Sequence, residues 1–306
     1  MEEKFKTCDD VLKQLVAARR EEVVRLQKSQ AEQIKDLDAR GKARLAALRK
    51  ILPRDTVAIM DKLDKTHHEA QAATKSQVDT IKARLADSGP APENETAAHP
   101  GLANGQLIAP GSLGWFTPYY GILHGSDGSV YGQGYYPYPF PGNSGGRIIL
   151  SVAAYGGGSG IFGTGAGSFT VYLDWWFSYV SRDYRYFGQT IWVPYHGFYI
   201  VRSDDGFWDS KEAHVRMDLS AVGYQYNYKS SGTTNVLNID SQNIDVNGRV
   251  DGWRTMYYSD LLGADRAYLR VTASFYVYAR GGGSYAELNF SAGTANYMGM
   301  PWVYVA

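Results

Sequence analysis

Leucine recurs every eleven residues in the first part of the chain, and this spacing constrains the fold more than any other feature. One row begins at Leu15 and a second, three residues earlier, begins at Leu12. Eleven residues in three turns give ~3.67 residues per turn, close to a straight α-helix, so the two rows form a narrow apolar stripe that drifts slowly around the helix. We therefore predict a long helix that joins sister chains through an oligomer seam. The seam residues are Leu12, Leu15, Val23, Leu26, Ile34, Leu37, Leu45, Leu48, Ile59, Leu63, Ile81 and Leu85.

Polar residues also occur at the same eleven-residue spacing. A third row contains Arg19, Gln30 and Gly41. Charged and amide side chains are costly to bury in a closed oligomer unless they are hydrogen-bonded, but polar seam residues can fix register and copy number. We expect a homo-oligomer, and a trimer is our guess.

Pro53 is the one proline in the helical region. Proline inside a helix costs about 3 kcal/mol, which favours a helical hairpin that reverses there. The apolar rows nevertheless keep their phase from Leu48 to Ile59, which a hairpin does not require. The sequence therefore favours one kinked rod of about 120 Å over the hairpin, which remains the alternative.

The composition changes abruptly after the helical region. Residues 87–105 are rich in proline and lack apolar periodicity, and 41 of the 42 aromatic residues follow residue 100. Such a proline-rich stretch indicates an extended spacer. We predict three parts: an oligomerisation stalk over residues 1–86, a linker over 87–105, and a Tyr- and Gly-rich head over 106–306.

The head has the period of β-strands. Apolar residues alternate with polar ones over 213–221 and 269–277, and an apolar row also runs through 171–179. Glycine clusters between such segments are typical of turns. The predicted fold is therefore α then β, segregated: a long coiled-coil-type helix followed by a head that is an antiparallel, jelly-roll-like β-sandwich.

Three groups of aromatic residues are candidate contacts for a ligand or a neighbouring subunit. The stretch YGQGYYPYPFPGNSGG, residues 131–146, is stiffened by proline, so its rings lose little entropy on binding. In VYLDWWFSYV, one tryptophan and one aspartate share the face opposite the apolar row, which suits a sugar; aromatic pairs on sheets are also common without a ligand. The candidates are Tyr135, Tyr136, Tyr138, Phe140, Asp174, Trp176, Tyr224, Tyr226 and Tyr228.

Catalytic and metal-binding motifs are missing from the sequence. No metal-binding histidine spacing, nucleophile elbow or phosphate-binding loop occurs, and Cys8 is the single cysteine. Two Asp-rich turns, at 204–209 and 240–251, have oxygen ligands of the kind that hold Ca²⁺, but ordinary turn formation explains them better. We expect no enzyme, no catalytic residue and no cofactor, with Ca²⁺ as a minor alternative.

Charge and hydropathy limit the partners and the location. The net charge is zero, and a phosphate-tracking protein needs a basic stripe, so nucleic acid is not expected. The first residues contain no apolar run suitable for a secretory signal or a membrane-spanning helix. We expect synthesis in the cytoplasm without membrane insertion, and leave open a role outside as part of a virion, an injection machine or a surface fibre.

A helical stalk, a proline-rich joint and a β head form an arrangement similar to phage or injection-machine tail fibres and to stalk-and-head adhesins. The resemblance is one of architecture and assigns no residues. It implies a non-enzymatic protein that oligomerises through its helix and presents aromatic surface to a glycan, a receptor or the next subunit. A self-assembling subunit of a filament, virion or shell is the alternative, and a polysaccharide-cleaving enzyme is less favoured.

Overall fold

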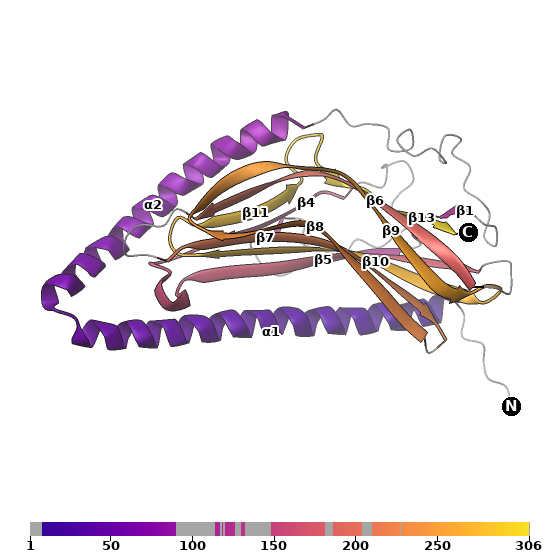
Figure 1. The fold of residues 1–306 in the computed structure, drawn as a ribbon, viewed down its shortest axis with the longest axis horizontal. Helices are drawn as coiled ribbons and strands as arrows, with labels where there is room; N and C mark the ends of the chain where they lie inside the picture. Colours follow the sequence, from indigo (N-terminus) through magenta and orange to yellow (C-terminus); the bar gives the residue numbers. More distant parts are fainter. Residues whose placement is uncertain are drawn as a thin grey trace.

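A computed structural model shows two helices followed by two antiparallel sheets stacked as a sandwich, which confirms the predicted order of elements (Figure 1). The structure describes residues 8–89, 114–116, 118, 120–125, 130–131, 148–180, 186–203, 210–226 and 228–305. Within them, neither helix is both long enough and apolar enough to cross a membrane.

The helical region is a hairpin, so the prediction of one kinked rod is wrong. Helix α1 (Cys8–Ile51) ends just before Pro53, and α2 (Arg54–Asp87) begins directly after it. Pro53 lacks a backbone N–H but its carbonyl accepts a hydrogen bond from Val57, so it is suited to the start of a helix rather than to its interior. The chain turns at this point, and α2 runs back over the opposite side of the sandwich from α1 (Figure 1).

One layer of the sandwich is a five-stranded sheet in the order β2-β5-β10-β7-β8. Long β5, β10 and β7 pair over most of their length, which gives a flat face for a helix. Its strands are β2 (Tyr120–His124), β5 (Ala166–Val180), β7 (Glu212–Gln225), β8 (Tyr228–Gln242) and β10 (Arg266–Arg280).

The other layer is an eight-stranded sheet centred on a single long strand, β6. This strand pairs with β9 on one side and with β11, β12 and β13 in succession on the other. The strands are β1 (Gly114–Phe116), β3 (Val130–Tyr131), β4 (Leu150–Tyr155), β6 (Tyr186–Ser203), β9 (Ile244–Leu262), β11 (Tyr285–Phe290), β12 (Tyr297–Met298) and β13 (Trp302–Val305).

The main core fills the space between the two sheets. The alternating apolar rows predicted over 171–179, 213–221 and 269–277 all point into it, with residues such as Leu173, Met217 and Phe275 completely buried. Phe290 of the other sheet meets Phe275 edge-on, with ring centroids 5.4 Å apart. The period of two therefore places one face of each strand inward, as the sequence predicts.

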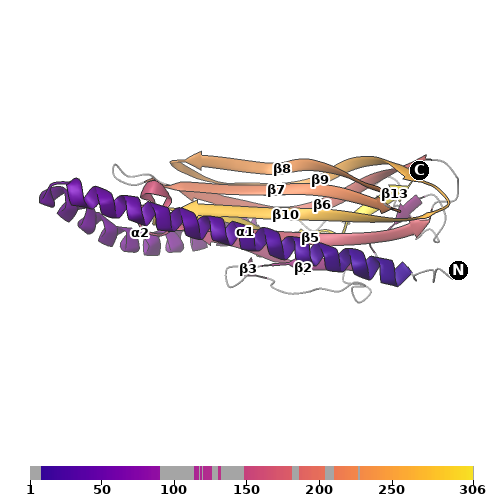
Figure 2. The ribbon, with the colours of Figure 1, turned by 90° about the horizontal axis from the view of Figure 1, so that it is seen from below.

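Helix α1 lies antiparallel to β5 on the outer face of the five-stranded sheet and leaves most of β7 and β8 uncovered (Figure 2). Arg19 contacts Asp174, and Gln30 hydrogen-bonds Ser168 and Thr170. Gly41 lies against the short 3₁₀ turn η1 (Ile161–Gly163), where an added Cβ would be 2.7 Å from the carbonyl oxygen of Phe162.

From one contact to the next, the residue number on α1 thus increases by eleven, while the residue number of its partner on or near β5 decreases by about five. Eleven helical residues rise about 16.5 Å and five strand residues span about the same distance. A helix with this spacing meets a straight strand at regular intervals, so the polar row of the sequence faces the head of its own chain.

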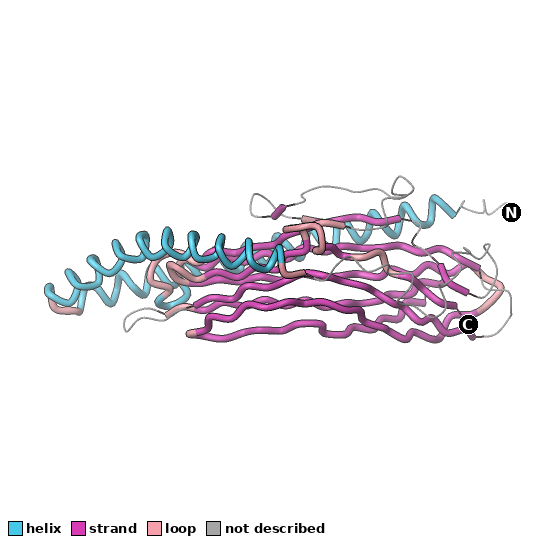
Figure 3. The backbone as a smooth tube through the Cα atoms, turned by 90° about the horizontal axis from the view of Figure 1, so that it is seen from above, coloured by secondary structure: helices cyan, strands magenta, loops and turns pink. Residues whose placement is uncertain are grey.

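Helix α2 covers part of the outer face of the eight-stranded sheet. Val78 and Leu85 are buried against Phe198 and Ile200 of β6 and Tyr285 of β11. The hairpin therefore straddles the sandwich, one helix on each sheet, and its apex projects past the strand ends (Figures 1 and 3).

The residues of the predicted oligomer seam do not share one environment: some pack against the head of the same chain, and others are exposed on the surface. Leu12, Val23 and Leu85 are buried in contacts within the chain, whereas Leu26 and Ile59 are 45% and 53% exposed. The side chain of Leu63 lies outside the described residues. The half-buried seam residues are Leu15, Ile34, Leu37, Leu45, Leu48 and Ile81.

Candidate functional site

A dense group of charged side chains lies under α1, around Asp174 of β5. Its carboxylate is fully buried and accepts hydrogen bonds from Arg19 Nε at 2.9 Å and Thr272 Oγ1 at 2.5 Å. His124 Nε2 of β2 lies 3.2 Å from the same carboxylate. One helix and three strands therefore meet at a single buried acid.

The electrostatics of this cluster keep Asp174 ionised. Burial alone would raise its pKa, but the close contact with His124 and the charges of Arg19 and Arg270 outweigh burial and lower the pKa to about 2. Burial likewise opposes the charge of Arg19, but Asp174 outweighs it and raises the pKa of the guanidinium above its ordinary value. Both partners are charged at any pH near neutrality.

A second layer of contacts surrounds the ion pair. Glu22 of α1 lies 2.9 Å from Arg19 and 3.7 Å from Arg270 of β10. The guanidinium of Arg19 lies 4.9 Å from the centre of the Tyr172 ring, and that of Arg270 lies 5.7 Å from Trp176. The charges of the two arginines are therefore balanced by those of Asp174 and Glu22, and both guanidinium groups also lie near aromatic rings.

Trp176 and Asp174 do not form an exposed platform, contrary to the sequence-based expectation. Both are 0% exposed because α1 covers them, and Tyr224 is stacked on Trp176 with ring centroids 5.7 Å apart. Leu12 packs on this pair together with Tyr268. No external ligand reaches these residues while α1 is in place.

The other predicted contact residues are scattered. Tyr226 is 74% exposed at the turn after β7, and Tyr228 begins β8. The proline-stiffened residues Tyr135, Tyr136, Tyr138 and Phe140 lie outside the described residues.

A smaller cluster under α2 is built around Glu287 of β11. This carboxylate is fully buried and accepts hydrogen bonds from Ser151 at 2.9 Å, Tyr285 at 2.6 Å and Asn289 at 2.8 Å. Lys82 of α2 supplies the positive charge at 3.0 Å. Burial, followed by the charge of Glu287, raises the pKa of Tyr285, so its hydroxyl stays a donor.

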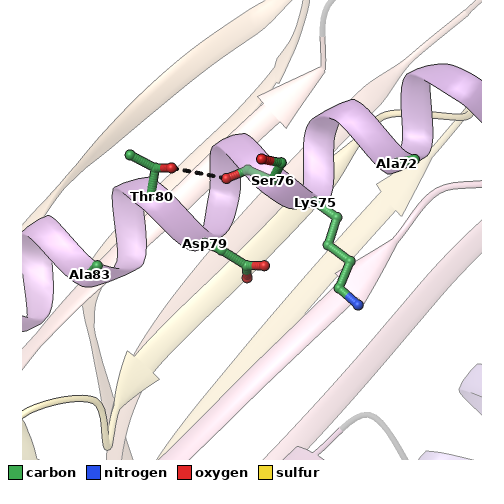
Figure 4. Close-up of a pocket in the computed structure, with 6 residues that line it drawn as sticks. All are labelled: Ala72, Lys75, Ser76, Asp79, Thr80 and Ala83. Atoms are coloured by element: carbon green, nitrogen blue, oxygen red, sulfur yellow. Dashed lines mark hydrogen bonds between the residues drawn. The ribbon is translucent and has the colours of Figure 1, made fainter.

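A shallow hollow of about 620 Å³ lies beside α2 (Figure 4). Lys75 and Asp79 point to one side of the helix, while the Thr80 hydroxyl donates to the Ser76 carbonyl on the other. Ala72 and Ala83 complete the lining. It is open and lined by one helix, so it lacks the enclosure and converging polar groups of a ligand pocket.

An aromatic face that sequence reasoning missed lies on the eight-stranded sheet, beyond the end of α2. Trp253 and Tyr257 of β9 are 55% and 74% exposed. Their neighbours across β6 are Pro194 and Thr190, and β13 adds Trp302 opposite Trp192 and Tyr304 opposite Thr190. We call this surface the aromatic face; its residues are Trp192, Trp253, Tyr257, Trp302 and Tyr304.

Local structure determines how much of the aromatic face is exposed. Tyr257 lies close over Gly188, where an added Cβ would be 2.6 Å from the tyrosine hydroxyl. Trp192 is only 4% exposed, so it adds little accessible surface to the face. The signal in the sequence was available: Trp253 and Tyr257 occupy the outward row of an alternating strand, and Trp302 and Tyr304 alternate with two buried valines.

Polar groups border the aromatic face, and its charges are paired. Asp251 contacts Arg249 at 2.6 Å and His196 at 3.6 Å. Burial alone would raise the pKa of Asp251, but the nearby His196 and the hydrogen bonds from Arg249 outweigh it and lower the pKa below its ordinary value. The face therefore offers donors and acceptors without an excess of either charge.

The second Asp-rich segment is engaged in strand contacts. Asp245 lies 3.8 Å from Arg202, and Asn247 accepts a hydrogen bond from Arg84 of α2. Within the described part of the chain, no three His, Cys, Asp or Glu residues are grouped as a metal site would require. The first segment, 204–209, lies outside that part.

Comparison with known proteins gives no family. No protein-family model and no curated protein matches the chain. Among solved structures, one similarity is to TmCBM61, a carbohydrate-binding module in complex with β-1,4-galactotriose, at 8% identity and a TM-score of 0.22 over 61% of this chain and 87% of that one.

A second similarity is to the enzymatically active domain of tailspike protein 4 of bacteriophage CBA120. The identity is 12% and the TM-score 0.15, over 63% of this chain and 19% of that one. Scores this low do not establish a common fold for either structure.

Proposed function

We propose that the protein is a non-enzymatic binding protein whose head holds a glycan on the aromatic face. The observation that carries the proposal is the group of Trp253, Tyr257, Trp302 and Tyr304 on the two strands that flank β6, with Trp253 and Tyr257 left largely exposed. A contiguous exposed aromatic patch on a folded head is typical of a recognition site.

The chemistry of the aromatic face suits an uncharged sugar. A pyranose presents an apolar C–H face that stacks on an indole or phenol ring and hydroxyls at its edge that need hydrogen-bonding partners. Tyrosine and tryptophan supply rigid amphipathic area at low entropic cost. Thr190 and Thr255 on the same outer face add hydroxyls, and the paired Asp251 and Arg249 give no net charge that would favour a phosphate ligand.

The test is a glycan-array screen of the full chain followed by calorimetric titration of the best glycan. We expect Trp253→Ala and Tyr257→Ala each to weaken binding about tenfold or more, because central aromatic anchors dominate such interfaces. Tyr226→Ala is the matched control, since Tyr226 is as exposed as Tyr257 but follows a strand of the other sheet. Equal losses in all three variants, or no glycan bound at all, would reject the proposal.

Self-association through the hairpin apex is a second candidate function. Ile51 and Ile59 are 79% and 53% exposed there, and Arg49 holds the two helices together through Asp61 at 2.9 Å. A coiled coil, with three copies as the guess, would cover these side chains and give several heads avidity for weak ligands. Light scattering tests it: Ile51→Ser with Ile59→Ser should lower the particle mass to that of one chain, and a wild type that is already monomeric would contradict it.

A further inference from the structure

Helix α1 is held on the five-stranded sheet by separate, regularly spaced anchors. Leu12 packs between aromatic rings, Arg19 meets the buried Asp174, and Gln30 uses both ends of its amide on Ser168 and Thr170. This is how an amphipathic helix binds a groove in another protein, through a few side chains on one face.

The sheet beneath α1 has the composition of a recognition surface. A permanently covered sheet face is normally apolar, but this one carries Asp174, Arg270 and Trp176. Arg270 Nε and Trp176 Nε1 are buried without a hydrogen-bonding partner, which leaves a desolvation cost in the closed form. The seat of α1 is therefore specific for this helix, although two of its buried donors lack acceptors.

The geometry points to a helix-docking site on β5 that takes α1 of a second copy of this chain in exchange for its own. The second copy carries the same anchors at the same spacing, so Leu12, Arg19 and Gln30 of one chain fit the aromatic rings, Asp174 and Ser168 of the other. Residues 90–113 connect the hairpin to the first strand, and 24 residues can span up to about 80 Å. The hairpin can therefore transfer without unfolding of the head, provided that α2 also leaves its contacts with Phe198, Ile200 and Tyr285. Exchange of an identical element remakes the same contacts and costs little at equilibrium.

Concentration decides between the two forms. The tether keeps a chain's own α1 at an effective concentration on the order of millimolar, so the closed single chain predominates in dilute solution. Exchange is expected at high protein concentration, and it is slow because Arg19 must leave the buried Asp174 first. The partner's guanidinium then completes the cluster around Asp174, so the acidic site contains residues of both chains.

Cross-linking between two single-cysteine variants tests the exchange. Both variants carry Cys8→Ser, one adds Gln30→Cys and the other Ser168→Cys, at positions whose side chains are 2.6 Å apart. After co-incubation at high concentration, dilution and treatment with a short bismaleimide, we expect a species of twice the chain mass. Gln33→Cys, on the exposed side of α1, replaces Gln30→Cys as the control and should give at least fivefold less.

Two further variants make the result decisive. A single chain carrying both Gln30→Cys and Ser168→Cys should cross-link internally, which verifies the seat of α1. Adding Arg19→Ala to the Gln30→Cys chain should reduce the mixed product severalfold, whereas Arg20→Ala should not.

Internal cross-linking of the double variant without any mixed product above the Gln33 control overturns the exchange. Failure of the double variant to cross-link overturns the docking geometry itself. Neither result bears on glycan binding by the aromatic face, which lies on the other sheet.

Discussion

The two helices hold the same sandwich by two different kinds of buried charge. Under α1, Asp174 depends on a cation that the helix supplies: Arg19 is 6% exposed and reaches into the sheet. Under α2, Glu287 already accepts three hydrogen bonds from the head, and Lys82 is 25% exposed. Asp174 therefore depends on Arg19 of α1 for its charge partner, whereas Glu287 is already satisfied by the head and gains only an additional contact from Lys82 of α2.

The difference indicates which helix is more tightly coupled to the head. A buried carboxylate that loses its partner keeps its desolvation penalty, and breaking such a pair typically costs 3–5 kcal/mol. A partly solvated lysine contributes far less. We therefore expect α1 to detach only with a large loss of stability and α2 to detach more easily.

Arg19→Met should have the largest effect. It keeps the apolar stem but leaves Asp174 buried without its main cation, and we expect a loss of about 3 kcal/mol in the free energy of unfolding. Urea denaturation followed by tryptophan fluorescence measures it, with Arg20→Met as the matched control on the exposed side. Adding Asp174→Asn should recover part of the loss; a double variant that is simply additive would show that the two side chains are not coupled.

Acid should weaken the α1 contact by an intermediate amount. The pKa of Asp174 is lowered to about 2 in the folded protein from 3.8, so its contribution is present above pH 4 and is lost as the pH falls from about 4 to 2. The shift corresponds to about 2 kcal/mol. Urea midpoints measured between pH 6 and pH 2.5 should show a smaller acid loss in Asp174→Asn than in the wild type, and equal losses would contradict the assignment.

Lys82→Met should have the smallest effect, about 1 kcal/mol or less, because Ser151, Tyr285 and Asn289 still satisfy Glu287. Lys75→Met, exposed on the same helix, is the control. A loss as large as that of Arg19→Met would mean that the two helices are held alike.

The sequence predicts the strands better than it predicts the place of the helices. Alternation over 171–179, 213–221 and 269–277 indicates the inward rows correctly because burial on one face imposes a period of two. The eleven-residue spacing indicates a straight helical face but not its partner, since a long strand of the same chain matches that spacing as well as a sister helix does. Arg19 and Gln30 in the polar row indicated that the surface against which this helix packs must offer polar partners, as β5 does.

The candidate site was only partly accessible to sequence reasoning. Trp176 was correctly placed opposite the core, but nothing local to β5 reveals that α1 covers it. Conversely, Trp253 and Trp302 form one face only because β9 and β13 both pair with β6, a long-range pairing that no local pattern encodes.

Small-angle X-ray scattering of the dilute full chain tests most directly whether the helices clasp their own head. The two helices fold back as a hairpin, so we expect a compact elongated particle whose profile matches the clasped structure. A particle in which a rod of about 120 Å extends beyond the head would contradict the packing of both helices on their own head and would support one extended helical stalk instead.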